Sequence, residues 1–167
     1  MSESDREHRA RLYTGEHGRT ILKCLGNGTD GSVWQTTRST AVKACEDYPR
    51  YSIERDCYRL FLDKGISEIC GYAIPRLIQF SDEHMVIEID MVKPPYILDF
   101  GKASLYRLPS HYTAEDIAEL YAERKLLYDE HWPTVRSILA RMRAMGVFHL
   151  DPRPHNIQPP NWNPSLD

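Results

Sequence analysis

Three closely spaced glycines are the first residues of this sequence that could do chemistry. Gly26, Gly28 and Gly31 form the pattern GxGxxG, and Val33 follows two positions later. Because glycine has no Cβ, a turn rich in it lets backbone N–H groups approach a phosphate closely. The pattern alone is weak, since it also opens dinucleotide-binding units, in which a helix must follow the glycines. The next residues decide between these readings.

Those residues favour a hairpin over a helix. The segment 32–37 (SVWQTT) is rich in β-branched residues, and the turn-prone residues 38–40 close it too soon for a helix. Glu46 or Asp47 stands where a ribose-binding acid would be expected, but the helix that such a unit requires is missing. The glycines are thus predicted in a β-hairpin, which either binds phosphates or is merely flexible.

A lysine and a glutamate downstream favour the phosphate-binding hairpin. Ala41-Val42-Lys43 is predicted to be a short strand, in which Ala41 and Lys43 face the same side because side chains alternate. Glu54 lies beside the apolar stripe of a predicted helix, where a carboxylate is costly unless it is paired. We therefore expect Lys43 and Glu54 to pair, leaving the lysine able to hold α- and β-phosphates. A lysine that simply reaches solvent is the competing interpretation.

The elements that position these residues fall into a strand-rich half and a helical half. Strands are predicted first, at residues 20–25, 32–37, 41–45, 75–80 and 84–91, with a helix over 51–64 between the third and the fourth. Lys93-Pro94-Pro95 is a stiff connector that marks the boundary. Beyond it, a capping signal opens a helix at Thr113 that runs to about Tyr128, and a second helix runs from near Pro133 to Gly146.

Taken together, these motifs resemble the protein-kinase superfamily. GNGTDGSV (26–33) resembles its Gly-rich loop, AVK (41–43) its ATP-lysine strand, Glu54 the partner on helix C, and MVIEIDM (85–91) the last strand and hinge. The strongest match is HLDPRPHN (149–156), which resembles the catalytic loop HxDxKPxN. A polar loop after a helix does not easily explain that second motif, in the family's order, downstream of a Gly-rich hairpin.

The resemblance implies the fold, the cofactors and the site. The fold would be α+β and bilobal, protein-kinase-like, with a complete antiparallel-sheet N-lobe bearing helix C and a reduced helical C-lobe. Residues 1–19 would be an N-terminal tail, 20–91 the N-lobe through the hinge, and 92–167 the reduced C-lobe with the catalytic loop. The cofactors would be ATP and Mg²⁺. The expected ATP-binding residues are Gly26, Gly28, Gly31, Val33, Ala41, Lys43, Glu54, Glu88 and Met91.

The same resemblance assigns roles in the catalytic loop. Asp151 would orient and deprotonate the attacking hydroxyl, with Lys43 as the second catalytic group. Arg153 would replace the usual lysine beside the γ-phosphate, and Asn156 would hold Mg²⁺. Asp167 is a weak further candidate for the metal, since no Phe-Gly follows it.

The chain also departs from the family. Asp99-Phe100-Gly101 looks like the metal-binding DFG, but it precedes the catalytic loop instead of following it. We interpret it as coincidental or structural, with a ribose contact, a helix cap or a rearranged metal site as the alternatives. Leu150 replaces the arginine that normally pairs with a phosphorylated activation loop, so activation by loop phosphorylation is not expected.

Three functions fit these observations. The favoured one is a minimal protein kinase, like the small bacterial effector kinases, that transfers the γ-phosphate of ATP to a protein Ser/Thr hydroxyl. The second is a catalytically weak, pseudokinase-like module that binds a protein partner. The third is a small-molecule kinase. The substrate, the partner and the oligomeric state are not fixed by the sequence.

Composition excludes several other classes. The net charge of −3 favours neither nucleic acid nor an anionic membrane, and the 41% hydrophobic and 27% charged residues are typical of a globular protein. No apolar run is long enough for a membrane span, and the charged N-terminus does not resemble a signal peptide. Cys24, Cys45, Cys57 and Cys70 form no metal-binding pattern, so reduced thiols in the cytoplasm are expected, with export as an effector left open.

Overall fold

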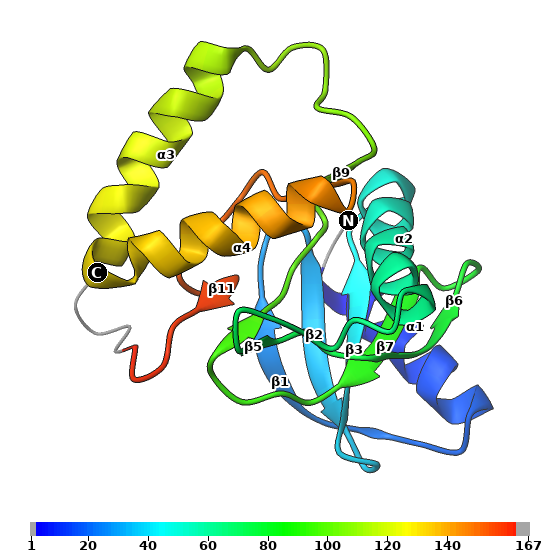
Figure 1. Cartoon of the computed structure of the whole chain (residues 1–167). Coiled ribbons are helices and arrows are strands. Elements are labelled where there is room, and N and C mark those ends of the chain that lie inside the picture. Colours follow the sequence, from blue (N-terminus) through cyan, green and yellow to red (C-terminus); the bar gives the residue numbers. More distant parts are fainter. Residues whose placement is uncertain (1–2, 163–167) are drawn as a thin grey trace. The chain divides into compact units, whose positions relative to one another are not determined.

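The structure is a computed structural model that describes residues 3–162. The chain forms two compact units, coloured along the sequence in Figure 1. The first unit comprises residues 1–65 and 75–91, and the second comprises 66–74 and 92–167. Segment 66–74, predicted as part of the first half, lies in the second unit.

The first unit is built on a five-stranded antiparallel sheet with the order β1-β2-β3-β7-β6. Its strands are β1 (Ile21–Asn27), β2 (Gly31–Thr36), β3 (Thr40–Cys45), β6 (Leu77–Ser81) and β7 (Val86–Asp90). These are the five predicted strands, shifted at their ends by a residue or two. β1 runs into β2 through the glycine-rich turn, so the hairpin predicted there is present.

Helix α2 (Tyr48–Asp63) packs against this sheet and matches the helix predicted over 51–64. It begins earlier than expected because the Asp47 carboxylate caps it, accepting a hydrogen bond of 2.9 Å from the Arg50 N–H group. Its buried stripe consists of Tyr51, Glu54, Cys57, Tyr58 and Phe61. The stripe therefore carries one carboxylate, Glu54, among aromatic and thiol side chains.

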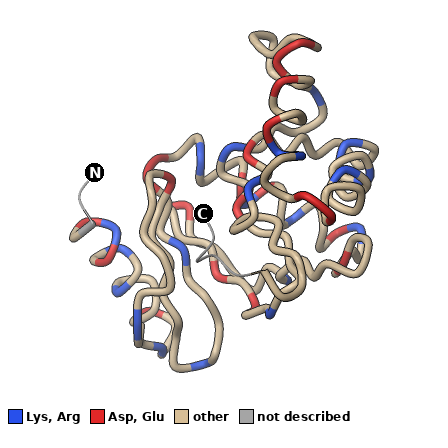
Figure 2. The backbone as a smooth tube through the Cα atoms, turned by 90° about the vertical axis from the view of Figure 1, so that its left-hand side faces the viewer, with Lys and Arg blue, Asp and Glu red and all other residues tan. Residues whose placement is uncertain are grey.

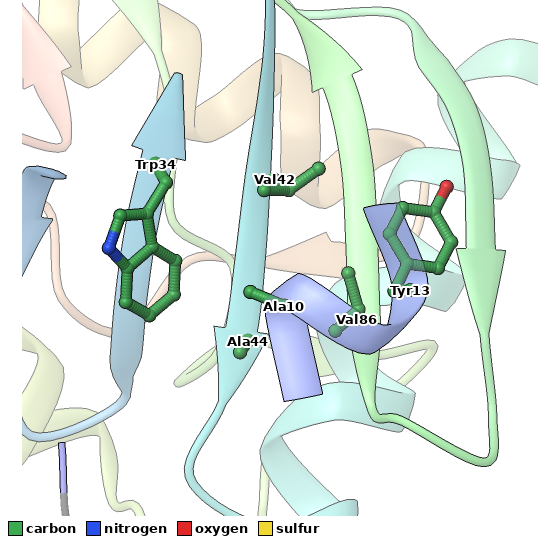
Figure 3. Packing of buried hydrophobic residues seen from close by; sticks show 6 residues of the cluster. All are labelled: Ala10, Tyr13, Trp34, Val42, Ala44 and Val86. Atoms are coloured by element: carbon green, nitrogen blue, oxygen red, sulfur yellow. The ribbon is translucent and has the colours of Figure 1, made fainter. Parts of the chain in front are cut away.

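The region expected as a tail instead contains helix α1 (Glu3–Glu16), a difference from the prediction. Figure 3 shows α1 packed on β3 and β7, where Ala10 and Tyr13 meet a cluster completed by Trp34, Val42, Ala44 and Val86. The other buried side chains of α1 are polar, those of Arg6 and Thr14. A stripe that is half polar gives almost no apolar periodicity, so the sequence pattern did not reveal it.

The second unit combines three helical segments with short strand pairs. The helices are α3 (Ala114–Tyr128), a 3-10 turn (Asp129–His131) and α4 (Trp132–Ala144), and the strands are β4 (Glu68–Ile69), β5 (Tyr72–Ala73), β8 (Tyr96–Ile97), β9 (Ser104–Leu105), β10 (Val147–Phe148) and β11 (Ile157–Gln158). The predicted capping box is present, because Thr113 and Asp116 each accept the other's backbone N–H group. The two-residue strands were not predicted, since they are too short to show a period.

Together these elements confirm an α+β chain with an antiparallel N-terminal sheet and a reduced helical part. Charges of both signs are interspersed along the two units, as Figure 2 shows. Among residues 3–162, none of the helices has both the length and the apolarity needed to cross a membrane.

Candidate functional site

The register of the sheet places four predicted nucleotide-site residues, Gly26, Val33, Ala41 and Lys43, on one face. Val33 pairs with Gly26 on one side and with Lys43 on the other. Directly opposite residues share a face, and so do residues two apart in a strand, which adds Ala41 to the set. Val42 alternates with Lys43 and packs against α1. These four residues therefore lie on the side of the sheet away from α1.

The expected ion pair is present on that face. Lys43 Nζ donates to Glu54 Oε2 over 2.7 Å, and the two residues are only 8% and 2% exposed. α2 supplies the carboxylate and β3 supplies the ammonium group, so the pair ties the helix to the sheet. A buried ion pair with this geometry holds the lysine in one position.

The glycine hairpin runs directly beside this lysine. A Cβ added to Gly31 would lie 2.6 Å from the Ala44 carbonyl oxygen and 3.2 Å from Lys43 Cε. Gly31 is therefore required by its close approach to β3. The Gly28 N–H group donates to the Gly31 carbonyl over 3.0 Å and closes the tip of the hairpin. The loop and the lysine are thus parts of one site.

The other two glycines are not explained by packing. A Cβ on Gly26 would meet nothing within 4 Å, and one on Gly28 would meet only the Gly31 carbonyl, at 4.0 Å. Neither residue has a positive φ, so the backbone does not demand glycine either. Glycine at both positions leaves the space beside the hairpin open, which fits the close approach of a phosphate chain to the backbone.

Glu88 does not fit the role expected for it. It was predicted to offer backbone groups to adenine, but it lies inside the sheet, paired with Val42 on one side and Gln79 on the other. Its fully buried carboxylate faces α1 instead, where it accepts from Tyr13 Oη over 2.8 Å and also from Arg19 and Thr40. Burial raises the Tyr13 pKa to about 12, which keeps this phenol a donor.

Met91, the other predicted hinge residue, follows β7 directly and is 43% exposed. It lies outside the sheet ladder, unlike Glu88. The backbone beyond the end of β7 thus remains the part of the predicted hinge that is open to a ligand.

Asp151 is the centre of the predicted catalytic loop, which belongs to the second unit. Three cationic groups surround its carboxylate: Arg153 Nε at 2.9 Å, Lys102 Nζ at 3.2 Å and Arg124 Nη2 at 3.9 Å. The carboxylate itself is 13% exposed, whereas the Arg153 and Lys102 side chains are about half exposed. This arrangement places positive charge around the Asp151 carboxylate.

Two further loop residues fix the backbone of Asp151. Asn156 Nδ2 donates to the Asp151 carbonyl over 2.8 Å, which leaves the amide oxygen Oδ1 as the group that can bind a cation. His149 Nδ1 accepts from the Asp151 N–H group over 3.3 Å, while His149 Nε2 lies 3.2 Å from the Leu98 carbonyl. Only the neutral imidazole with its proton on Nε2 satisfies both contacts, and burial accordingly lowers the His149 pKa.

The Asp99-Phe100-Gly101 segment, interpreted from sequence as coincidental or structural, lies against the catalytic loop. The Leu98 N–H group donates to the Asn156 carbonyl over 2.6 Å. The buried Phe100 ring meets the His149 ring edge-on, with 5.5 Å between centroids. Asp99 has a φ of 57°, a left-handed conformation that aspartate tolerates better than most residues. The segment therefore supports the loop in space although it precedes it in sequence.

Sequence reasoning missed Lys102 and Arg124 as neighbours of Asp151. Lys102 lies 49 positions upstream of Asp151, so no local spacing could reveal it. The one feature of the sequence that could have drawn attention to Lys102 was its position directly after Asp99-Phe100-Gly101. Asp167 lies outside the described residues. Within residues 3–162, no group of three or more His, Cys, Asp or Glu side chains could hold a metal ion.

No protein-family model matches the chain, and no curated protein matches it. One similar solved structure is the aminoglycoside phosphotransferase APH(2'')-Ib with bound ADP, at 17% identity and a TM-score of 0.43, over 80% of this chain and 39% of that one. Another is the streptomycin–ATP–APH(2'')-IIa ternary complex, at 19% identity and a TM-score of 0.42, with the same coverage of 80% and 39%. This chain thus spans about two-fifths of these structures. The candidate site described above rests on the chain's own residues.

Proposed function

We propose that this chain is an ATP-dependent phosphotransferase that moves the γ-phosphate of ATP to a hydroxyl group. The observation that carries the proposal is the buried pair Lys43–Glu54 beside a glycine hairpin whose Gly31 lies against the lysine. A pinned ammonium group and open backbone N–H groups are what a phosphate chain requires.

The nucleotide would lie on the sheet face opposite α1. Lys43 would hold the α- and β-phosphates, and the hairpin N–H groups would bind the phosphate oxygens. The side chains of Val33 and Ala41 share that face and would give an apolar surface for adenine. With the Glu88 backbone committed to the sheet, Met91 is the hinge residue that we assign to the adenine edge.

Asp151 would act as the base for transfer. The acceptor hydroxyl attacks the γ-phosphorus, the bond to the β–γ bridging oxygen breaks, and the hydroxyl proton passes to the Asp151 carboxylate. Asn156 and His149 would keep the Asp151 backbone in place through the contacts described above. Arg153 and Lys102, both partly exposed, would offset the charge of the transferred group.

Asn156 Oδ1 and the Asp99 carboxylate would hold Mg²⁺. Both offer the oxygen ligands that this ion prefers, and Asp99 follows Leu98, whose N–H group binds the Asn156 carbonyl. When bound, the metal would neutralise phosphate charge. This assignment takes up the rearranged metal site, one of the alternatives to the coincidental or structural interpretation of Asp99, and it would give the chain a carboxylate ligand upstream of the catalytic loop.

The acceptor that we propose is a protein Ser/Thr hydroxyl. A small hydroxyl-bearing molecule and a partner-binding role without catalysis are the competing functions. Transfer to a protein acceptor supports the first function, and transfer to a small-molecule acceptor supports the second. The partner-binding role predicts no turnover with any acceptor.

The first test is calorimetric titration of ATP with and without Mg²⁺. We expect binding that Lys43→Ala abolishes and that Lys64→Ala leaves intact, since Lys64 is an exposed lysine at the end of α2, outside the sheet. Asp151→Asn should bind ATP as tightly as the unaltered chain but lose transfer to panels of protein and small-molecule acceptors. Absence of ATP binding in the unaltered chain would refute the proposal, and full transfer by Asp151→Asn would refute the role of Asp151.

A further inference from the structure

Helix α1 holds the tip of the glycine hairpin through one arginine. Arg6 Nη1 donates to the Gly28 carbonyl oxygen over 2.7 Å, a contact between residues 22 positions apart. The same atom lies 3.5 Å from Glu46 Oε2, and Arg6 is only 8% exposed. The guanidinium is therefore fixed between the start of α1, the hairpin tip and the residue that follows β3.

This bond sets the direction of one peptide group. The Gly28–Thr29 peptide is trans, so its N–H group, which belongs to Thr29, points opposite to its carbonyl. Because the carbonyl points to Arg6, the Thr29 N–H group points away from α1. Lys43 lies on the side of the sheet away from α1. Among residues 3–162, no hydrogen bond of the Thr29 N–H group is found.

The peptide on the other side of Thr29 is held as well. The Glu46 N–H group donates to the Asp30 carbonyl over 3.0 Å, and Arg50 Nε donates to Asp30 Oδ1 over 2.9 Å. Asp30 is only 8% exposed. Thr29 is thus an exposed residue between two fixed ones, with one N–H group aimed outward from the tip.

We propose that Arg6 is a positioning residue for nucleotide binding: it orients the Gly28–Thr29 peptide so that the Thr29 N–H group meets a phosphate of ATP. The inference rests on the proposed function. It gives α1 a part in the nucleotide site without any contact between α1 and the nucleotide. It also explains why a buried cation lies at the start of a helix whose core contacts come from Ala10 and Tyr13.

The test compares Arg6→Met, which keeps most of the stem but removes the donors, with Arg6→Lys, which keeps one charged donor. Arg11→Met is the matched control, because Arg11 lies on the same helix with a 59% exposed side chain that pairs only with the nearby Glu7 in the described contacts. MgATP and adenosine are titrated into each variant by calorimetry, adenosine by displacement. Thermal unfolding of each variant is measured in parallel.

We expect Arg6→Met to weaken MgATP binding about tenfold, as loss of a charge-assisted hydrogen bond would. Adenosine affinity should not change, because adenosine has no phosphates, and Arg6→Lys should recover part of the loss. A purely structural role of Arg6 would lower both affinities together. In amide NMR spectra, the Thr29 signal should shift on ATP addition in the unaltered chain and lose most of that shift in Arg6→Met.

Two results would overturn the inference. Unchanged MgATP affinity in a folded Arg6→Met variant would do so while leaving the proposed function intact. Equal losses for MgATP and adenosine would do so as well. Should Arg6→Met fail to fold, the Thr29 signal of the unaltered chain decides, since a signal that does not shift on ATP addition would contradict the role. If the unaltered chain binds no ATP, both this inference and the proposed function fail.

Discussion

Replacing Lys43 by Met separates the structural role of this lysine from its proposed role in binding. The substitution removes the ammonium group and leaves the Glu54 carboxylate, 2% exposed, without the ion pair it makes over 2.7 Å. Breaking a buried pair on one side costs about 3–5 kcal/mol, because the remaining charge has lost its compensation. In a chain of 167 residues, that corresponds to a fall in melting temperature on the order of 10 °C.

The second variant tests the origin of that cost. In Lys43→Met with Glu54→Leu, both charges are replaced by apolar groups of similar volume, and the stability should return to within about 1 kcal/mol of the unaltered chain. ATP binding should not return, because the phosphate-binding cation is still missing. Stability is measured by urea unfolding and binding by calorimetry, with Lys64→Met as the exposed-lysine control.

Two outcomes would refute this reasoning. A double variant as unstable as Lys43→Met would mean that the lysine stabilises the unit by something other than its pairing with Glu54. A double variant that binds ATP as the unaltered chain does would remove Lys43 from the nucleotide site. Either result is visible in the same two measurements.

Three other substitutions or conditions give further predictions. Gly31→Ala should cost about 1–3 kcal/mol and weaken ATP binding, since its Cβ would lie 2.6 Å from the Ala44 carbonyl; thermal unfolding and calorimetry check this, and an unaltered melting temperature would contradict it. The unfolded chain protonates His149 near its ordinary pKa of 6.5 while the buried imidazole resists, so stability should fall as the pH drops below about 6.5, and the urea midpoint of His149→Gln should lose this part of the pH dependence. Glu88→Gln should cost about 3 kcal/mol by leaving Arg19 buried beside a neutral amide, yet ATP affinity should stay unchanged, because that carboxylate faces α1; a large loss of affinity would restore Glu88 to the nucleotide site.

Prediction from the sequence was most accurate for features that depend on a few neighbouring residues. The strands and α2 were found because alternation, periodicity and stop signals such as Gly65 act over a few residues. The pairing of Lys43 with Glu54 was found because a buried carboxylate needs a partner, and one cation lay on the adjoining strand. In each case the physical reason operates within one element or between two neighbouring ones.

The sequence-based prediction failed where a residue's position depends on contacts with residues distant in the sequence. α1 was predicted to be a tail because half of its buried stripe is polar. Arg6 can be buried because the Gly28 carbonyl and the Glu46 carboxylate pair with its guanidinium group. Lys102 reaches Asp151 across 49 positions. Glu88 was assigned to the adenine by motif position, which does not show where β7 ends and its backbone groups stop pairing with neighbouring strands.

The interleaved course of the chain has a consequence for how this protein can be cut and recombined. The polypeptide passes from one unit to the other at residues 65–66, 74–75 and 91–92. A fragment ending at residue 91 would carry β5 away from β8, which pairs with it in parallel, and would expose Ile69, Tyr72 and Ile74, each now 4% exposed. We therefore expect that neither the chain up to residue 91 nor the chain after it folds as an independent domain. A split or domain-swapped version of the protein would need residues 66–74 to be redesigned.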